Sequence, residues 1–451
     1  MMTKRLPPAG VAREELLRSL RERRRDDADW RHGRIWSLVY HADEGHSAFL
    51  AEVYRHFFAE NGLSPTAFPS LRKLEAEVVA MLLGLVGARG GEVGSMTSGG
   101  SESILLAVKA YRDRWRAEHA GAGTPEMVVP ASAHPAFLKA AAYFDLRPVV
   151  VPVGADFRAD PRAVEAALGE STACIVASAP SYPQGVVDPV AELGRLALAA
   201  GVGLHVDACL GGMLLPFLRR LGHPVPGFDF AVPGVTSISV DLHKYGYAAK
   251  GASAVLYRDA GLHQHQFFVC ADWPGGLYGS PTMAGTRSGG IIAAAWAALM
   301  SFGEEGYLRL AGETMELTER LVEGIAAIPG LRLLGRPDMS VLAFSSDAVS
   351  VLSVARRLEA GGWRIDRQRD PDAIHMIVTP NHRQAVDPFL EDLARSVAEE
   401  REHRGDGDGD GDGEALLYGV TAEVPAGADR EAFLRSQMSE TYRLRRDADG
   451  A

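Results

Sequence analysis

The chain has 451 residues, of which 47% are hydrophobic and 23% charged, and this length suggests a large domain joined to a smaller one. Its formal net charge of -11 argues against a nucleic-acid partner, because binding without sequence preference needs a positive surface that neutralises phosphates. Three widely spaced cysteines support neither a disulfide framework nor a zinc site, and the absence of a signal peptide or a long apolar run predicts a cytoplasmic protein with no membrane span.

Taken in chain order, the sequence divides into three parts. We expect an N-terminal arm with helices over residues 1–60, a large domain over 61–303 and a small α+β domain over 304–451. Helical periodicity predicts helices over 48–60 and 71–85. The low-complexity run of alternating Gly and Asp at 405–413 is interpreted as a flexible, negatively charged surface loop and not as a metal site.

The large domain alternates short apolar runs with helical patterns. Strands are predicted over 127–130, 149–153, 174–177, 204–206, 237–240 and 254–257, and helices over 101–117, 135–143, 160–168 and 190–200. This alternation predicts an α/β fold with a mainly parallel sheet covered by helices on both faces. Ligands of such sheets bind beyond the carboxyl ends of the strands.

The stretch at 236–251 carries the central chemical signal. An alternating β-branched run ends at Asp241 and leads into a loop that holds His243 and Lys244 side by side. A lysine at the end of a buried strand can lose its proton and form an imine, which is the chemistry of a pyridoxal phosphate (PLP) lysine. A single His-Lys pair is more often part of a solvated loop, so the interpretation depends on four other stretches.

The first of these, residues 96–103, contains Ser98, Gly99, Gly100 and Ser101 ahead of a predicted helix. Glycines allow close approach of an anion, and hydroxyls and free amides at a helix N-terminus bind phosphate. The alternative is an ordinary helix start with Ser101 as its N-cap.

Two further residues follow predicted strands. His134 could lie flat on a pyridine ring, or it could simply cap the next helix. Asp207 could pair with a protonated pyridine nitrogen, and a buried carboxylate needs such a cation or other donors. The alternative for Asp207 is a loop cap, which is less favoured because Lys244 follows at another strand end.

The last stretch, residues 278–290, is rich in hydroxyls and glycine and holds one arginine, Arg287. Arg287 could bind an anionic substrate group or a phosphate. It could equally hold the loop in place.

Together these stretches resemble the fold type I PLP enzymes, and more closely the sphingosine-1-phosphate lyase family within the PLP-dependent decarboxylase-like proteins. The most specific strings lie at 205–212 (HVDACLGG) and 241–251 (DLHKYGYAAKG), and the resemblance covers roughly residues 34–425. It implies that Lys244 binds the cofactor covalently, that Asp207 contacts the pyridine nitrogen and that His134 stacks on the ring.

The resemblance also implies a phosphate site and an assembly. The expected phosphate-binding residues are Ser98, Gly99, Gly100, Ser101 and His243. The family's active site lies at a dimer interface, so the resemblance implies a homodimer in which Gly285 and Thr286 reach the partner's cofactor.

The chain departs from the family at two positions. Ser64, in Asn61-Gly-Leu-Ser-Pro, stands where the family commonly has His, and Gln184 stands where it has the His of Phe-Pro-His-Gly. The first of these histidines looks like a ligand of the substrate phosphate, so its loss puts a phosphorylated substrate in question. The expected substrate-binding residues are Asn61, Ser64, Gln184, Lys250 and Arg287.

The reaction implied is retro-aldol cleavage of a 2-amino-3-hydroxy compound to an aldehyde and an amine. A base must remove the proton of the C3 hydroxyl, and Tyr40, Tyr247 and Lys250 match family positions without a ranking. Lys250 could instead bind a substrate anion. The rival reaction is α-decarboxylation of an amino acid, which needs a carboxylate holder such as Arg287, and a further alternative is a non-catalytic PLP- or lipid-binding protein.

Overall fold

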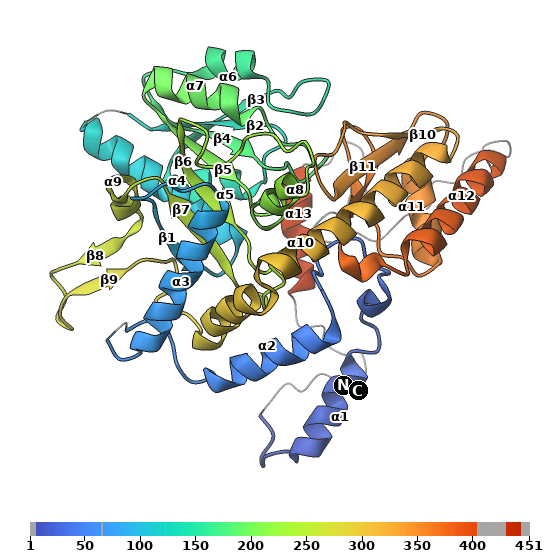
Figure 1. Ribbon diagram of the computed structural model, residues 1–451, viewed down its shortest axis with the longest axis horizontal. Helices are drawn as coiled ribbons and strands as arrows, with labels where there is room; N and C mark the ends of the chain where they lie inside the picture. The colour runs from blue at the N-terminus through green and yellow to red at the C-terminus, as the bar shows by residue number, and fades with distance from the viewer. Residues whose placement is uncertain (1–5, 65, 122, 404–429, 443–451) are drawn as a thin grey trace.

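The computed structural model describes residues 6–64, 66–121, 123–403 and 430–442. Figure 1 shows two bodies bridged by one long helix, with N-terminal helices beside them. The arm contains α1 (Arg13–Arg23), η1 (Trp30–His32) and α2 (Glu44–His56). The predicted Gly-Asp loop at 405–413 lies outside the described residues.

The helix predicted over 48–60 is displaced toward the N-terminus. It begins at Glu44 because Asp43 caps it, accepting a hydrogen bond from the backbone amide of His46 at 2.7 Å. The helix predicted over 71–85 is α3 (Pro69–Leu85), which begins at a proline, as first helical turns often do.

The large domain is built on a seven-stranded sheet. The strands, in spatial order, are β1 (Val93–Thr97), β7 (Ser253–Tyr257), β6 (Val235–Val240), β5 (Gly203–Asp207), β4 (Thr172–Ser178), β2 (Glu126–Pro130) and β3 (Arg147–Val151). Only β7 runs antiparallel to its neighbours β1 and β6, so the prediction of a mainly parallel sheet is confirmed. Every residue of β4 is buried, as expected of a central strand covered on both faces.

Helices cover both faces of this sheet. One face carries α4 (Gly100–Glu118) and α5 (Ala136–Phe144) with their own apolar core. The other carries α3, α6 (Pro161–Ala167) and α7 (Val190–Ala200) around a second core. Short helices lie in the connections: η2 (Gly211–Met213), α8 (Leu215–Arg220), α9 (Ala260–His263) and η3 (Gln264–Gln266).

The hairpin of β8 (Phe268–Cys270) and β9 (Tyr278–Ser280) extends away from the large domain, as the yellow arrows of Figure 1 show. Each strand has only three residues, which is too short for a recognisable alternation, so the hairpin was not predicted from the sequence. The hairpin leads directly into the loop before α10 (Gly289–Ala327).

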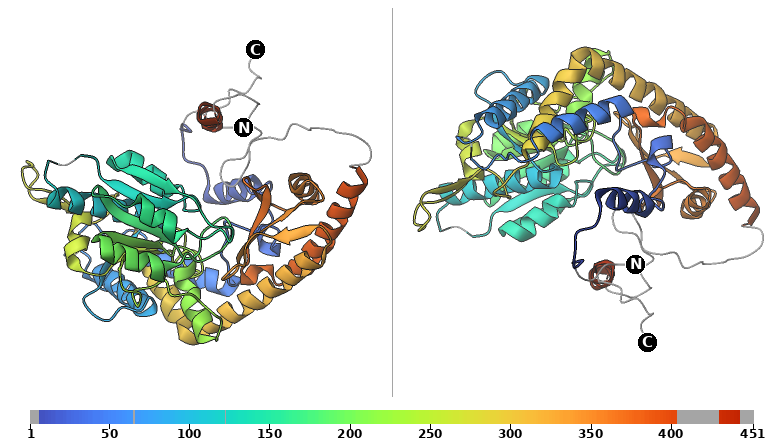
Figure 2. Two further views of the ribbon diagram at one scale, coloured as in Figure 1. Left: turned by 90° about the horizontal axis from the view of Figure 1, so that it is seen from above. Right: turned by 90° about the horizontal axis from the view of Figure 1, so that it is seen from below.

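The helix α10 joins the two domains, and both views of Figure 2 show it running along one side of the molecule. Its backbone leaves the helical conformation at Gly303, where φ is 55°. Glycine adopts such positive φ angles at little cost, so the kink falls where a side chain would be strained. Gly303 is also the last residue of the predicted large domain, although the division itself stays a prediction.

The small domain has a four-stranded antiparallel sheet with helices on one side, which agrees with the predicted α+β pattern. Its strands, in spatial order, are β10 (Leu331–Leu333), β11 (Val341–Ser346), β13 (Ala373–Ile377) and β12 (Asp366–Gln368). Its helices are α11 (Val351–Ala360), η4 (Pro380–His382) and α12 (Val386–His403), and α13 (Arg430–Thr441) follows further along the chain. None of the helices in the described part of the chain combines the length and apolar character needed to cross a membrane.

Candidate functional site

A cavity of about 450 Å³ lies at the carboxyl ends of the central strands, between the large and the small domain. We call it the central cavity. Ten of the residues singled out from the sequence line it: Tyr40, Ser98, Gly99, Gly100, Ser101, His134, Asp207, His243, Lys244 and Lys250. The position agrees with the rule that parallel sheets bind ligands beyond their strand ends.

Lys244 reaches the central cavity from the turn after β6. Its Nζ lies 3.0 Å from Oδ2 of Asp241, a buried carboxylate at the end of the same strand. Burial lowers the pKa of Lys244, but the nearby charges, chiefly that of Asp241, and the hydrogen bond to Asp241 together outweigh this effect, and the pKa is raised overall. Lys244 is therefore held as a cation at a fixed place until another group engages its amine.

Asp207 stands at the end of β5, beside Lys244. Its Oδ1 accepts hydrogen bonds from the backbone amide of Cys209 at 3.0 Å and from Oγ of Ser239 at 3.2 Å. Two donors to one oxygen fix the orientation of the carboxylate. Asp207 can then present its other oxygen to a cationic nitrogen in the cavity.

His134 follows β2 at the opposite wall. Its Nδ1 accepts a hydrogen bond from the backbone amide of Ala136 at 3.1 Å, which places the ring proton on Nε2. Burial lowers the pKa of His134 despite the opposing effect of the Asp207 charge, so the ring is neutral. A neutral, oriented imidazole is suited to stack on an aromatic ring.

The loop between β1 and α4 forms a cradle for an anion. The helix α4 begins at Gly100, its N-cap is Gly99, and no side chain caps it. The alternative of Ser101 as N-cap is therefore wrong, because the N-cap is Gly99, two residues earlier, and Ser101 lies within the first helical turn. A Cβ on Gly100 would lie 2.7 Å from Sγ of Cys209, so only glycine fits there.

These residues fit PLP. The cavity offers a lysine amine, an oriented carboxylate, a flat imidazole and the open N-terminus of a 19-residue helix. Two buried polar atoms beside them, Oδ1 of Asp241 and Nδ1 of His243, have no hydrogen-bond partner among the described residues. Orphaned polar atoms at the base of a cavity indicate a polar ligand or water.

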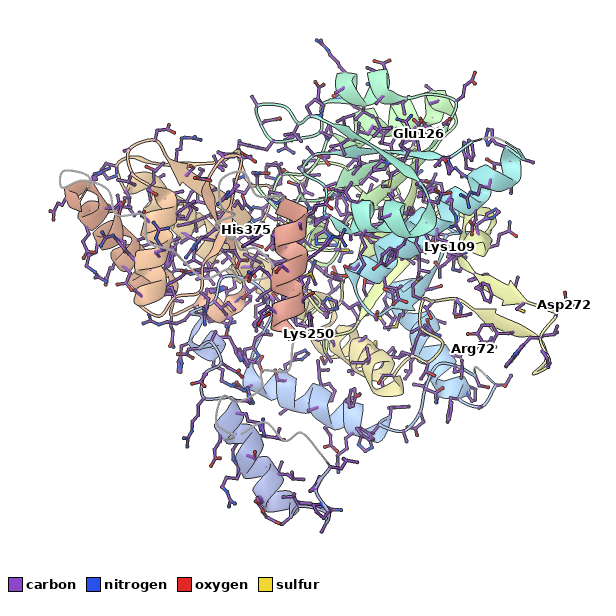
Figure 3. The ribbon with its side chains drawn as sticks, turned by 180° about the vertical axis from the view of Figure 1, so that it is seen from behind. Arg72, Lys109, Glu126, Lys250, Asp272 and His375 are labelled. Carbon is purple, nitrogen blue, oxygen red and sulfur yellow. The ribbon has the colours of Figure 1, made fainter. Side chains whose placement is uncertain are left out.

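Lys250 and Tyr40 form the rim of the central cavity, and Figure 3 labels Lys250 between the two domains. Nζ of Lys250 donates to the backbone carbonyls of Leu38 at 2.9 Å and His243 at 3.3 Å, and lies 4.9 Å from the ring centre of Tyr40. Leu38 adopts a positive φ of 65°, a strained conformation that directs its carbonyl. Burial and the charge of Lys244 lower the pKa of Lys250 to about 8.

Several of the expected residues lie outside the central cavity. Tyr247, a candidate base, is 5% exposed and packs in the core with its ring edge against Phe302. Thr286 and Arg287 line a separate cavity of about 190 Å³, and Gly285 is exposed beside them. Arg287 forms an ion pair with Glu75, so in this structure it serves to hold its loop.

The expected substrate-binding residues Asn61, Ser64 and Gln184 also lie elsewhere. Oδ1 of Asn61 accepts the backbone amide of Leu63 at 3.1 Å, and Oγ of Ser64 lies 3.2 Å from the hydroxyl of Thr66. Gln184 lines a cavity of about 570 Å³ between the domains. Their roles toward a substrate stay predictions.

Sequence reasoning missed two residues that shape the site. Glu102 is buried, and its carboxylate accepts the backbone amides of Ser98 at 2.6 Å and Met283 at 2.8 Å, which ties the cradle to the loop before α10. Tyr182 lines the central cavity, and its hydroxyl donates to Oδ2 of Asp366 at 3.2 Å. The position of Glu102 in the first turn of a predicted helix could have indicated its role. No local signal indicates Tyr182, because only the fold brings it to Asp366.

Comparisons with known proteins identify relatives that use pyridoxal phosphate. The family described as the pyridoxal-dependent decarboxylase conserved domain matches residues 28–346. A sphingosine-1-phosphate lyase of Arabidopsis thaliana is 43% identical over 448 residues, covering 98% of this chain and 81% of the relative. An L-aspartate decarboxylase of Thermococcus kodakarensis is 33% identical over 388 residues, covering 86% of this chain and 98% of the relative.

A solved structure shows the same architecture. The sphingosine-1-phosphate lyase of Burkholderia pseudomallei superimposes with a TM-score of 0.89 at 39% identity, covering 98% of each chain. The similarity spans both domains, so the fold is that of the fold type I PLP enzymes.

Proposed function

The chain belongs to the sphingosine-1-phosphate lyases within the pyridoxal-dependent decarboxylase family, and from this membership and the geometry of the central cavity we propose that it is a PLP-dependent aldehyde-lyase. Its substrate is a 2-amino-3-hydroxy compound of the sphingoid-base 1-phosphate type. The products are an aldehyde, released by retro-aldol cleavage of the C2–C3 bond, and an amine.

The residues of the cavity divide the work of holding PLP. Lys244 would supply the amine that binds it, Asp207 would pair with its ring nitrogen, His134 would support the ring, and the cradle at 98–101 with His243 would hold the phosphate; all of these residues line the cavity. When bound, PLP supplies an electron sink for the carbanion left by bond cleavage. Asp241, whose Oδ2 lies 3.0 Å from Nζ of Lys244, would balance the positive charge of that amine whenever it is protonated.

The base that takes the hydroxyl proton is Lys250. Of the three candidates, Tyr247 lies in the core, while Tyr40 and Lys250 line the cavity. A neutral amine has two N–H groups and one lone pair. The backbone carbonyls of Leu38 and His243 accept hydrogen bonds from the two N–H groups. The lone pair is then free to accept a proton, and a pKa of about 8 gives an appreciable neutral fraction near neutrality.

Carbon–carbon cleavage is favoured over decarboxylation because Arg287 is already bound to other groups of the protein. A decarboxylase needs a holder for the substrate carboxylate, and Arg287 is occupied by Glu75 and the backbone carbonyl of Gly62. Among the described residues that line the central cavity, the lysines are Lys244 and Lys250 and none is an arginine. The non-catalytic alternative is disfavoured because Lys244, Asp207 and His134 converge on one cavity.

We also propose a homodimer in the cytoplasm. The hairpin exposes apolar side chains that a monomer would leave in water, including Val269 at 74% and Leu277 at 88% exposure. Gly285 and Thr286 are exposed in the loop that follows the hairpin, and we propose that they reach the partner's cofactor. The free thiols of Cys174, Cys209 and Cys270 support a reducing compartment.

The test uses purified protein supplemented with PLP. The near-ultraviolet and visible absorbance should show a cofactor band that is lost in Lys244→Ala, and addition of sphinganine 1-phosphate should release a long-chain aldehyde. Retention of PLP without aldehyde release would refute the lyase assignment for this substrate. Release of carbon dioxide from an amino acid would instead identify a decarboxylase.

A further inference from the structure

A continuous file of hydrogen-bonding side chains runs from Asp207 into the interior of the sheet. Oγ of Ser239 contacts Oδ1 of Asp207 at 3.2 Å and Nε2 of His205 at 3.4 Å. On the other side of the imidazole, Nδ1 lies 2.7 Å from Oγ of Ser237, which in turn lies 2.6 Å from the hydroxyl of Tyr111. We call these four residues, Ser239, His205, Ser237 and Tyr111, the relay.

The relay is sealed from solvent. His205 is 1% exposed, and Ser237, Ser239 and Tyr111 are wholly buried. The ring of Tyr111, at the far end of the relay, packs so closely on Gly203 that a Cβ at that position would collide with it. Buried polar groups cost free energy unless they are paired, so a fully paired file of this length indicates a function for its pairing.

The charge of Asp207 determines where every proton of the relay lies. An ionised carboxylate only accepts, so Ser239 must donate to it. Having used its one proton, Ser239 can only accept from Nε2–H of His205 and from the thiol of Cys209 at 3.3 Å. Nδ1 of His205 is then an acceptor.

The remaining links follow in the same direction. Ser237 must donate to Nδ1 of His205, and Tyr111 can donate to Ser237. Burial lowers the pKa of His205 to about 4 against the opposing effect of Asp207, so the ring carries one proton near neutral pH. All dipoles of the relay therefore point toward the carboxylate.

We propose that His205, through Ser239, is a positioning residue for the cofactor: the relay holds Asp207 as an oriented anion that faces the PLP ring nitrogen. None of its four members lines the central cavity, so its effect must pass through the cavity residues that Ser239 contacts, which are Asp207 and Cys209. The inference rests on the cofactor assignment and not on the identity of the substrate. A failure of aldehyde release would leave it standing.

The first test reads the tautomer of His205 by nitrogen-15 NMR of the full chain. We expect a neutral Nε2–H ring between about pH 5 and pH 8, the range in which an unperturbed histidine would titrate. The amide of Asp207→Asn can donate a hydrogen bond to Ser239, so Ser239 can in turn donate to Nε2 of His205. The Nδ1–H tautomer of His205 should then become populated in this variant. A wild-type Nδ1–H ring, or a tautomer that ignores Asp207→Asn, would overturn the proposal.

The second test measures the dissociation constant of PLP for the full chain after removal of the cofactor. Ser239→Ala removes a hydrogen bond to the Asp207 carboxylate and should weaken PLP binding by about tenfold to hundredfold. His205→Leu removes the imidazole donor to the buried Ser239 and should weaken PLP binding by about tenfold. His205→Gln keeps an amide donor near the position of Nε2 and should restore most of the affinity. Equal losses in His205→Leu and His205→Gln would indicate that the imidazole merely fills space.

A matched control is the second serine-histidine pair, Oγ of Ser95 and Nε2 of His263 at 2.9 Å, which has no contact with Asp207. His263→Gln should leave PLP affinity within about twofold of wild type, because an isolated neutral hydrogen bond contributes little. If His263→Gln weakens PLP binding as much as His205→Leu, the effect is one of general stability and the proposal fails.

Discussion

Replacing Gly100 with alanine would place a methyl group where the cradle has no room. The added Cβ would lie 2.7 Å from Sγ of Cys209 and 2.9 Å from Oδ2 of Asp241, and both side chains are buried. Neither can move aside freely, because Asp241 is held by its ion pair with Lys244.

The expected cost follows from this overlap. Overpacking a buried site costs about 1–3 kcal/mol, and the helix propensity of alanine returns at most about 1 kcal/mol. We expect a net loss of about 1–2 kcal/mol in the free energy of unfolding of the cofactor-free chain. Since 1.4 kcal/mol is a factor of ten, a similar strain on Asp241 and Lys244 should weaken PLP binding by about tenfold.

The assay pairs Gly100→Ala with Gly99→Ala. A Cβ on Gly99 would meet Cε1 of His243 at 3.6 Å, an ordinary contact, and its φ of 160° is extended backbone that any residue adopts. Urea unfolding followed by tryptophan fluorescence should separate the two variants, with Gly99→Ala within about 0.5 kcal/mol of wild type, the usual range for a substitution that disturbs no packing. Equal stability and PLP affinity in Gly100→Ala and wild type would refute the steric reasoning.

Three further predictions concern the base, the arginine and the hairpin. Because the neutral form of Lys250 is the base and its pKa is lowered to about 8, the cleavage rate should rise with pH through this value. Lys250→Met should abolish cleavage while keeping the PLP absorbance band. A cleavage rate that does not change with pH around 8 would contradict the assignment of Lys250 as the base. Arg287→Met leaves the half-buried Glu75 without its cation, so thermal denaturation should show a loss of about 1–3 kcal/mol, whereas unchanged stability would show that the ion pair is dispensable. The double variant Val269→Asp, Leu277→Asp places charges on the exposed hairpin, so light scattering should report monomers; a persistent dimer would place the interface elsewhere.

Local patterns determined much of this protein. The alternation of apolar runs and helices predicted the mainly parallel sheet, because a strand buried on both faces is largely apolar, as β4 is between its polar ends Thr172 and Ser178. The carboxyl ends of β5 and β6 then brought Asp207 and Lys244 together, since parallel strands end at one edge of the sheet. The phosphate cradle could be predicted from the sequence because a glycine-rich helix start depends only on neighbouring residues.

Only the tertiary structure decided which candidates share the cavity. Tyr247 and Lys250 stand three residues apart, yet Tyr247 turns into the core with a positive φ of 51° while Lys250 lines the rim. Arg287 meets Glu75 from a position 212 residues away. The pattern around each of these residues is compatible with either outcome, because a side chain's partner across the fold depends on how distant segments pack and not on its neighbours in sequence.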